Sequence, residues 1–266
     1  MDINTVTEFA PAVGAGWRAG DAWLGGGTWL FSQPQPGITR LLDLAAFGWP
    51  AITETEDGLR IAATCTLAEL ARWRPRHDWP AARLAEQCCD ALLGSFKVHN
   101  MATVGGNICL SLPAGPMTAL VAALDGAATL HAPDGGSRQV PVAGFVTGDG
   151  RNVLRPGELL REVVLPAGPL RARTAFRQVS LSPVGRSAVL VIARHDLGGG
   201  GAVVTVTAST PRPVQLRFGS PPPPAGAVAA LDAAAPGYLD DVHGSAAWRA
   251  AMTRRAVAAV VAELAP

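Results

Sequence analysis

The chain has 266 residues, of which 48% are hydrophobic and 16% are charged, and its formal net charge is +1 at pH 7. This length allows two domains with a substantial core, and the near-neutral charge without a basic stripe argues against a nucleic-acid-binding protein. The low charged fraction has two explanations, a surface partly covered by a partner or simply a composition rich in Ala, Gly and Pro.

The sequence shows no targeting or metal-binding signal. The segment MDINTVTEFAPAVGAGW has neither the basic nor the apolar region of a signal peptide, and no window approaches about 18 uninterrupted apolar residues, as a membrane-spanning helix would require. The four cysteines, at positions 65, 88, 89 and 109, form no Cys-x-x-Cys pair and no four-ligand spacing for zinc or an iron–sulfur cluster. We therefore expect a cytoplasmic protein with reduced thiols and no metal site.

Short strand-like runs separated by turn residues dominate the first half of the chain. Three helices are predicted among them. TLAELARW (66–73) starts with Thr66 and carries Glu69 three residues later, which is the pattern of a capping box. A second helix is predicted over 79–94, ending at Gly94, and a third over 113–126, with Pro near its start and Gly at its end. The strand-like runs are DAWLGG, ITRLLDL, GLRIAAT, AATLHA and REVVLP.

From about residue 168 the pattern becomes that of an antiparallel sheet. The runs TAFRQVSLSP and SAVLVIARHDLGGGGAVVTVTAST resemble strands of an antiparallel sheet, and the four glycines at 198–201 predict a hairpin turn between two of them. The prolines at 221–224 indicate a loop, and the apolar spacing over 246–265 predicts a terminal helix. We expect an α+β domain over residues 1–167 and a sheet-plus-helix domain over 168–266.

One short pattern is interpreted as a turn rather than a nucleotide site. GAGWRA (14–19) fits Gly-x-Gly-x-x-Ala, but a dinucleotide-binding loop needs a strand before it and a long helix after it. The preceding EFAPAV is a poor strand, and Gly20-Asp21 ends any helix almost at once. No phosphate-binding Walker loop, nucleophile elbow or His-Glu-x-x-His motif occurs elsewhere.

Two other glycine motifs are candidates for a phosphate site. LGGGTWL (24–30) places three glycines before Thr28, and ATVGGNICLSLPAG (102–115) places two glycines between Thr103 and Asn107. Glycine lets a backbone approach a ligand closely, exposed amides in such turns form an anion-binding concavity, and Thr and Asn add directed donors. Two such loops would hold the two phosphates of one dinucleotide from opposite sides. On the residues alone, two unrelated turns explain the pattern equally well.

The pair of motifs resembles the flavin-binding subunit of the molybdenum hydroxylases, the family of xanthine dehydrogenase and carbon monoxide dehydrogenase. The resemblance runs along nearly the whole chain, because further segments occur in the family's order and spacing. These are LLDL (41–44), DGLRIAATCTLAELA (57–71), RPGELLREVVLP (155–166), AFRQVSLSPVGRSAVLVIA (175–193) and DVHGSAAWRAAMTRRAVAAVV (241–261). It implies an α+β fold of the vanillyl-alcohol-oxidase type: a two-subdomain FAD-binding domain over 1–167, divided near 50–56, followed by the antiparallel sheet-plus-helix domain.

The resemblance implies FAD as the cofactor, bound between the two subdomains, with the C-terminal domain helping to cover its ring. The first loop would wrap the pyrophosphate through its amides, and the second would hold the pyrophosphate and the ribityl side. A leucine would pack near the flavin, and a cation would lie near the isoalloxazine, where relatives carry a lysine. The residues implied in these roles are Leu24, Gly25, Gly26, Gly27, Thr28, Trp29 and Leu30, then Thr103, Gly105, Gly106 and Asn107, and finally Leu160 and Arg177.

Several positions qualify this picture. Arg177 is equally well explained as a strand residue paired with a nearby acid, and we expect Trp29 to face away from FAD and pack on the protein. Trp29 stands where the family has Asp, Ser or Glu, Pro116 where it has Asp, and His99 where it has Arg. Since a lost hydrogen bond to a ligand costs about 1 kcal/mol, these departures predict a divergent member with weakened FAD binding.

The resemblance also implies a function that needs no catalytic side chain from this chain. The protein would pass electrons from [2Fe–2S] clusters through FAD to NAD, oxygen or a quinone, with an iron–sulfur subunit and a molybdopterin subunit as its partners. Two alternatives stay open. One is a stand-alone flavin-dependent oxidoreductase without molybdenum partners, and the other is a non-enzymatic scaffold subunit that has lost FAD.

Overall fold

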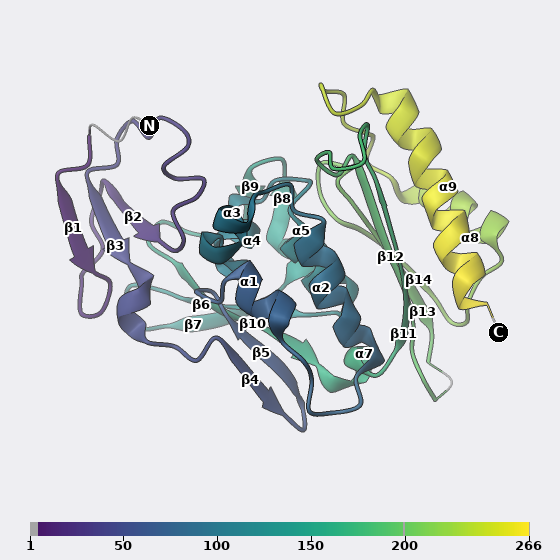
Figure 1. The fold of residues 1–266 in the computed structure, drawn as a ribbon, viewed down its shortest axis with the longest axis horizontal. Coiled ribbons are helices and arrows are strands. Elements are labelled where there is room, and N and C mark those ends of the chain that lie inside the picture. Colours follow the sequence, from purple (N-terminus) through teal and green to yellow (C-terminus); the bar gives the residue numbers. More distant parts are fainter. Residues whose placement is uncertain (1–4, 199, 266) are drawn as a thin grey trace.

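A computed structural model describes residues 5–198 and 200–265 of the chain. Its elements follow one another along the long axis of the molecule. A small N-terminal sheet lies at one end, a larger sheet covered by helices lies in the middle, and a second helix-covered sheet forms the other end (Figure 1). The expected α+β fold with an antiparallel C-terminal sheet is therefore confirmed.

The N-terminal sheet has three strands, β1 (Glu8–Pro11), β2 (Asp21–Leu24) and β3 (Arg40–Asp43), in the order β1-β3-β2. Both strand pairs are parallel. Arg40 donates to both carboxylate oxygens of Asp21 at 2.7 and 2.6 Å, and this hydrogen-bonded pair holds the pKa of Asp21 below its usual value. Because β2 ends at Leu24, the first residue of the first glycine motif, the buried pair holds the strand that leads into that loop.

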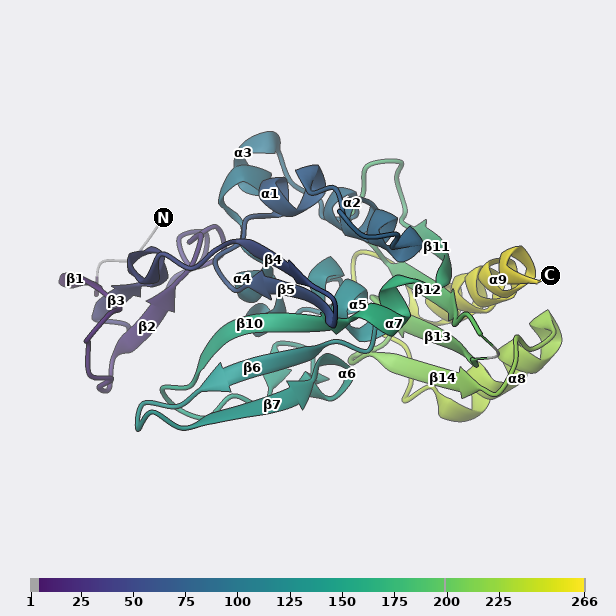
Figure 2. The same cartoon turned by 90° about the horizontal axis from the view of Figure 1, so that it is seen from below.

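The central sheet has five antiparallel strands in the order β4-β5-β10-β6-β7. Helices α1 to α5 cover one of its faces (Figure 2). Helix α5 is buried along all eight of its residues, which places it in the centre of the main hydrophobic core. The strands are β4 (Ile52–Thr55), β5 (Gly58–Ala62), β10 (Leu159–Pro166), β6 (Ala127–His131) and β7 (Ser137–Pro141), and the helices are α1 (Leu67–Arg72), α2 (Arg83–Asp90), α3 (Phe96–Met101), α4 (Val104–Leu110) and α5 (Pro116–Ala123).

Short elements connect these layers. They are the 3-10 turns η1 (Leu44–Phe47) and η2 (Pro80–Ala82), helices α6 (Val142–Phe145) and α7 (Ala167–Leu170), and the strand pair β8 (Val146–Gly148) and β9 (Arg151–Asn152). None of the described helices is long and apolar enough to cross a membrane.

The C-terminal sheet is a simple antiparallel meander, with each strand paired to the next. Its strands are β11 (Arg173–Val179), β12 (Val189–His195), β13 (Ala202–Thr207) and β14 (Val214–Phe218). Val189 and Val191 pack in a core with α8 (Pro224–Ala234) and α9 (Ala246–Leu264), whereas Leu190 and Ile192 belong to the main core around α5. Both faces of β12 are buried, which explains the run of five apolar residues over 189–193.

Most local signals in the sequence predicted their elements correctly. Thr66 and Glu69 form the capping box at the start of α1, and the terminal helix spans 246–264. GAGWRA (14–19) is an irregular segment with a turn at each end and no helix after it. The turn that begins at Gly198 joins β12 to β13, and position 199 lies outside the described residues. The predicted end of the second helix was wrong, because α2 stops at Asp90.

Candidate functional site

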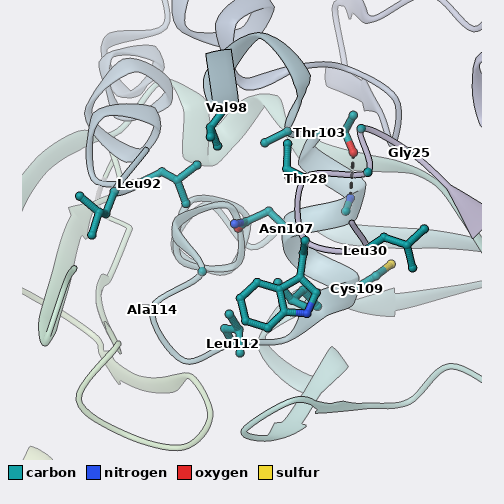
Figure 3. Close-up of a pocket in the computed structure, with 18 of the residues that line it drawn as sticks. Gly25, Thr28, Leu30, Leu92, Val98, Thr103, Asn107, Cys109, Leu112 and Ala114 are labelled. Atoms are coloured by element: carbon teal, nitrogen blue, oxygen red, sulfur yellow. Dashed lines mark hydrogen bonds between the residues drawn. The ribbon is translucent and has the colours of Figure 1, made fainter. Parts of the chain in front are cut away.

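A cavity of about 590 Å³ opens between the first glycine motif, helix α4 and the segment that links α2 to α3. In Figure 3, Gly25, Leu30 and Cys109 lie on one side of this cavity, Leu92 and Ala114 lie on the other, and Asn107 lies between them. The residues that line it are Trp23, Leu24, Gly25, Gly26, Gly27, Thr28, Trp29, Leu30, Gln35, Ala91, Leu92, Leu93, Val98, Ala102, Thr103, Gly106, Asn107, Cys109, Leu110, Leu112, Ala114, Gly115 and Arg186.

The first glycine motif presents a row of free backbone amides. The chain makes one helical turn after the glycines, in which Phe31 N donates to Gly27 O and Ser32 N donates to Trp29 O, each at 2.9 Å. Within the part of the chain that the structure describes, the amides of residues 26–30 donate to no protein acceptor. Because backbone N–H groups require a partner, consecutive free amides at a cavity wall form a site for an anion.

The two glycine motifs lie in direct contact. A Cβ atom added to Gly26 would lie 1.5 Å from the carbonyl oxygen of Met101, and one added to Gly25 would lie 2.9 Å from Oγ1 of Thr103. Only glycine permits so close an approach at position 26. The motifs therefore form one continuous wall of the cavity, and they are not unrelated turns.

The second motif is the start of a helix rather than a loop. Thr103 is the N-cap of α4, and its Oγ1 accepts a hydrogen bond from Gly106 N at 3.1 Å. Asn107 lines the cavity, and its Oδ1 accepts from Met117 N at 3.0 Å, which leaves its NH₂ group for a ligand. Gly105 N instead donates to Ala63 O at 3.0 Å, and a Cβ at this glycine would meet the Ala63 side chain at 2.4 Å. Gly105 thus permits close packing, and it does not border the cavity.

Two other implied residues also lie outside the cavity. Leu160 is buried on β10, opposite Leu130 of β6, in the main core. Arg177 lies on β11, where its Nη2 is 2.7 Å from Oε2 of Glu263 in α9. By contrast, Trp29 borders the cavity and is 44% exposed, which contradicts our expectation that it faces away from the cofactor site.

Much of the opposite wall was missed from the sequence. Leu92, Leu93 and Val98 come from the region around the α2–α3 connection, and Leu112 comes from the segment after α4. These residues follow no pattern that separates them from ordinary core residues. Cys109 also borders the cavity, and burial raises the pKa of its thiol to about 12, so it is protonated at neutral pH and a poor nucleophile.

A buried carboxylate links the cavity to the central sheet. Trp23 lines the cavity, and its Nε1 donates to the backbone carbonyl oxygen of Glu158 at 3.2 Å. The Glu158 carboxylate accepts two hydrogen bonds from Arg138, at 2.8 and 2.6 Å, and one from Arg155 N at 2.7 Å. The bonds from Arg138 are the main cause that lowers the pKa of Glu158 to about 2. The motif RPGELL therefore has a structural role, since Glu158 joins Trp23 of the N-terminal sheet to Arg138 of the central sheet.

The cavity fits FAD in both its chemistry and its size. One wall offers the free amides of residues 26–30, the hydroxyls of Thr28 and Thr103 and the amide of Asn107, which are donors suited to a pyrophosphate. The opposite wall is apolar, with Leu92, Val98 and Leu112 among its residues, and suits a flat ring system. Its volume lies in the range of about 300–1,000 Å³ that is usual for cofactor sites.

Comparison with known proteins agrees with this geometry. Residues 6–168 match the family model of the FAD binding domain in molybdopterin dehydrogenase. A stretch of 117 residues, 42% of this chain and 8% of the relative, is 28% identical to xanthine dehydrogenase of Oryza sativa subsp. japonica. A stretch of 91 residues, 33% of this chain and 30% of the relative, is 32% identical to the nicotinate dehydrogenase FAD-subunit of Eubacterium barkeri. The matched parts thus span less than one third of either curated relative.

Solved structures show the same fold. CO dehydrogenase from Oligotropha carboxidovorans superposes with a TM-score of 0.85 over 98% of each chain, at 22% identity. Quinoline 2-oxidoreductase from Pseudomonas putida 86 gives a TM-score of 0.80 over 99% of this chain and 98% of its own, at 20% identity. Because the family model covers more than half of the sequence, the chain belongs to the FAD-binding domain family of the molybdopterin dehydrogenases, and its cofactor is FAD.

Proposed function

We propose that this chain is the FAD-binding electron-transfer subunit of a molybdopterin- and iron–sulfur-dependent hydroxylase or dehydrogenase. The observation that carries the proposal is the continuous wall in which the free amides of residues 26–30 adjoin Thr103 and Asn107. This donor set suits a dinucleotide pyrophosphate, and it faces an apolar wall on the other side of one cavity.

In this proposal each group has a physical task. The amides of residues 26–30 and the Thr28 hydroxyl bind the pyrophosphate, and the Asn107 NH₂ binds the adjoining phosphate or ribityl oxygens. The apolar side chains of Leu92 and Val98 exclude water around the ring. Bound FAD supplies the redox chemistry, linking one-electron donors to an acceptor such as NAD, oxygen or a quinone.

We infer that the iron–sulfur clusters and the molybdopterin reside on separate partner subunits. The cysteines of this chain have no cluster spacing, and one of the curated relatives is an FAD-subunit by name. The substrate would then be chosen by the molybdopterin subunit. This chain would control how tightly FAD is held and how readily it is reduced.

Purification separates this proposal from its alternatives. The complex is isolated from its native cells through a tag on this chain, and its flavin, iron, acid-labile sulfide and molybdenum are measured. The proposal predicts a brown complex that contains flavin, iron, acid-labile sulfide and molybdenum in fixed ratio. A yellow protein without iron and molybdenum would support the stand-alone oxidoreductase. A complex that contains iron, sulfide and molybdenum but no flavin, and that cannot be reconstituted with FAD, would identify a scaffold subunit.

A further inference from the structure

A single arginine from the C-terminal part of the chain borders the cavity. Arg186 lies in the loop between β11 and β12, directly before Ser187. Ser187 Oγ donates to Ala91 O at 3.3 Å and accepts from Gln178 Nε2 at 2.9 Å, so this part of the loop is tied to residue 91. Residues 91–93 line the apolar wall, and Arg186 therefore reaches the cavity on that side.

The charge of Arg186 has no opposite charge paired with it among residues 5–198 and 200–265. Of the described residues that line the cavity, Arg186 is the only charged one. Among the ion pairs and hydrogen bonds between described residues, none involves its guanidinium, whereas Arg177 is paired with Glu263. A half-buried cation beside apolar side chains loses hydration without compensation. An anionic ligand in the cavity would supply that compensation.

We propose that Arg186 lies against the isoalloxazine ring and stabilises its anionic reduced form, which makes it a positioning residue that sets the flavin potential. The inference rests on the proposed placement of FAD, with the pyrophosphate on the amides of residues 26–30 and the ring on the apolar side. Two electrons from one-electron iron–sulfur donors and one proton from solvent, bound at N5, leave one negative charge near N1. The guanidinium compensates that charge, which is absent from the oxidised ring.

The test compares oxidised and reduced FAD in the same variants. Arg186→Gln and Arg186→Met remove the charge, Arg186→Lys keeps it, and Arg177→Gln is the matched control on the same domain. The affinity of oxidised FAD is measured by fluorescence titration, and the midpoint potential is measured against a reference dye. The two together give the affinity for reduced FAD, because binding and reduction are linked.

The expected result is a selective loss of affinity for reduced FAD. R186Q and R186M should bind oxidised FAD within about twofold of the wild type and reduced FAD about tenfold more weakly. The midpoint potential then falls by about 30 mV for a two-electron couple. R186K should retain most of the potential, and R177Q should leave both affinities unchanged.

Two outcomes would overturn the inference while leaving the proposed function intact. Equal weakening of both redox forms, with no change in potential, would place Arg186 on the pyrophosphate. Unchanged affinities and potential in both charge-removing variants would place its side chain away from the cofactor. If the wild-type protein itself bound no FAD, the proposed function would fail together with the inference. Because Arg186 makes no hydrogen bond within the described part of the protein, removing it should leave the fold intact, as circular dichroism can verify.

Discussion

Gly26→Ala is the most direct test of the contact between the two glycine motifs. The added methyl group would lie 1.5 Å from the carbonyl oxygen of Met101 and 2.5 Å from its carbonyl carbon. Since carbon and oxygen atoms in contact lie about 3.3 Å apart, the first loop must shift by about 2 Å. The obstacle is backbone on both sides, so no side-chain rotation relieves the clash.

Such a shift carries the free amides of residues 26–30 away from the pyrophosphate. A hydrogen bond to a charged group contributes about 1.5–3 kcal/mol, so the loss of two weakens FAD by at least about 100-fold. The melting temperature should change little, because the loop lies outside the main hydrophobic core. The dissociation constant is measured by flavin fluorescence and the fold by thermal denaturation.

A matched control lies in the same subdomain. A Cβ added to Gly16 meets no atom within 4 Å, so Gly16→Ala should bind FAD as the wild type does. If Gly26→Ala and Gly16→Ala bound FAD with equal affinity, the claim that close packing of the two motifs shapes the phosphate site would be refuted.

Three further predictions concern the cofactor site and its supports. Asn107→Asp keeps the acceptor for helix α5 but replaces the NH₂ donor with a negative charge, so FAD titration should show at least about tenfold weaker binding at unchanged melting temperature. The pKa of Glu158 falls from an ordinary value of 4.5 to about 2 in the folded protein, so its stabilisation is complete above pH 4.5 and is lost as pH falls toward 2. Urea denaturation should show a fall of at most about 3 kcal/mol in the free energy of unfolding over this pH range. The same fall should be much smaller in Glu158→Gln. Arg194→Leu should lower the free energy of unfolding by about 3 kcal/mol, since it removes one of the two arginines paired with the partly buried Asp125. Arg217 is an exposed partner of the same carboxylate, so Arg217→Gln should lower the free energy of unfolding by less than about 1 kcal/mol.

The sequence identified elements whose signals are local. The capping box at Thr66 and the apolar spacing of the last helix depend on neighbouring residues, so both were predicted with nearly correct bounds. Helix α4 was missed because two of its first three residues are glycines, which oppose helix formation on their own. Tertiary packing decides that conformation, since Gly105 is held against the backbone and side chain of Ala63.

The two walls of the candidate site also differ in how far the sequence predicted them. The polar wall carries glycine motifs and was found from the sequence, whereas the apolar wall has no motif and was missed. Arg177 and Arg186 show the limit most clearly, because both lie in one resembling segment only nine positions apart. The sequence offered pairing with an acid as one of two explanations of Arg177, and the structure shows that pair with Glu263 of α9. No pattern in the sequence indicates that Arg186 borders the cavity.

Helix α5 connects the C-terminal sheet to the cavity. The C-terminal part of the chain contributes one lining residue, Arg186, yet it supports the cavity wall through this helix. At its C-terminal end, Arg194 donates to Ala123 O at 2.7 Å and Gln215 donates to Ala122 O at 2.6 Å, both from the C-terminal sheet. At its N-terminal end, Met117 N donates to Asn107 in the cavity wall. The helix therefore joins the C-terminal sheet to the donor set for the pyrophosphate. All eight residues of α5 are buried, so removing residues 168–266 would expose apolar surface and release this support. We therefore expect FAD binding to need the C-terminal sheet.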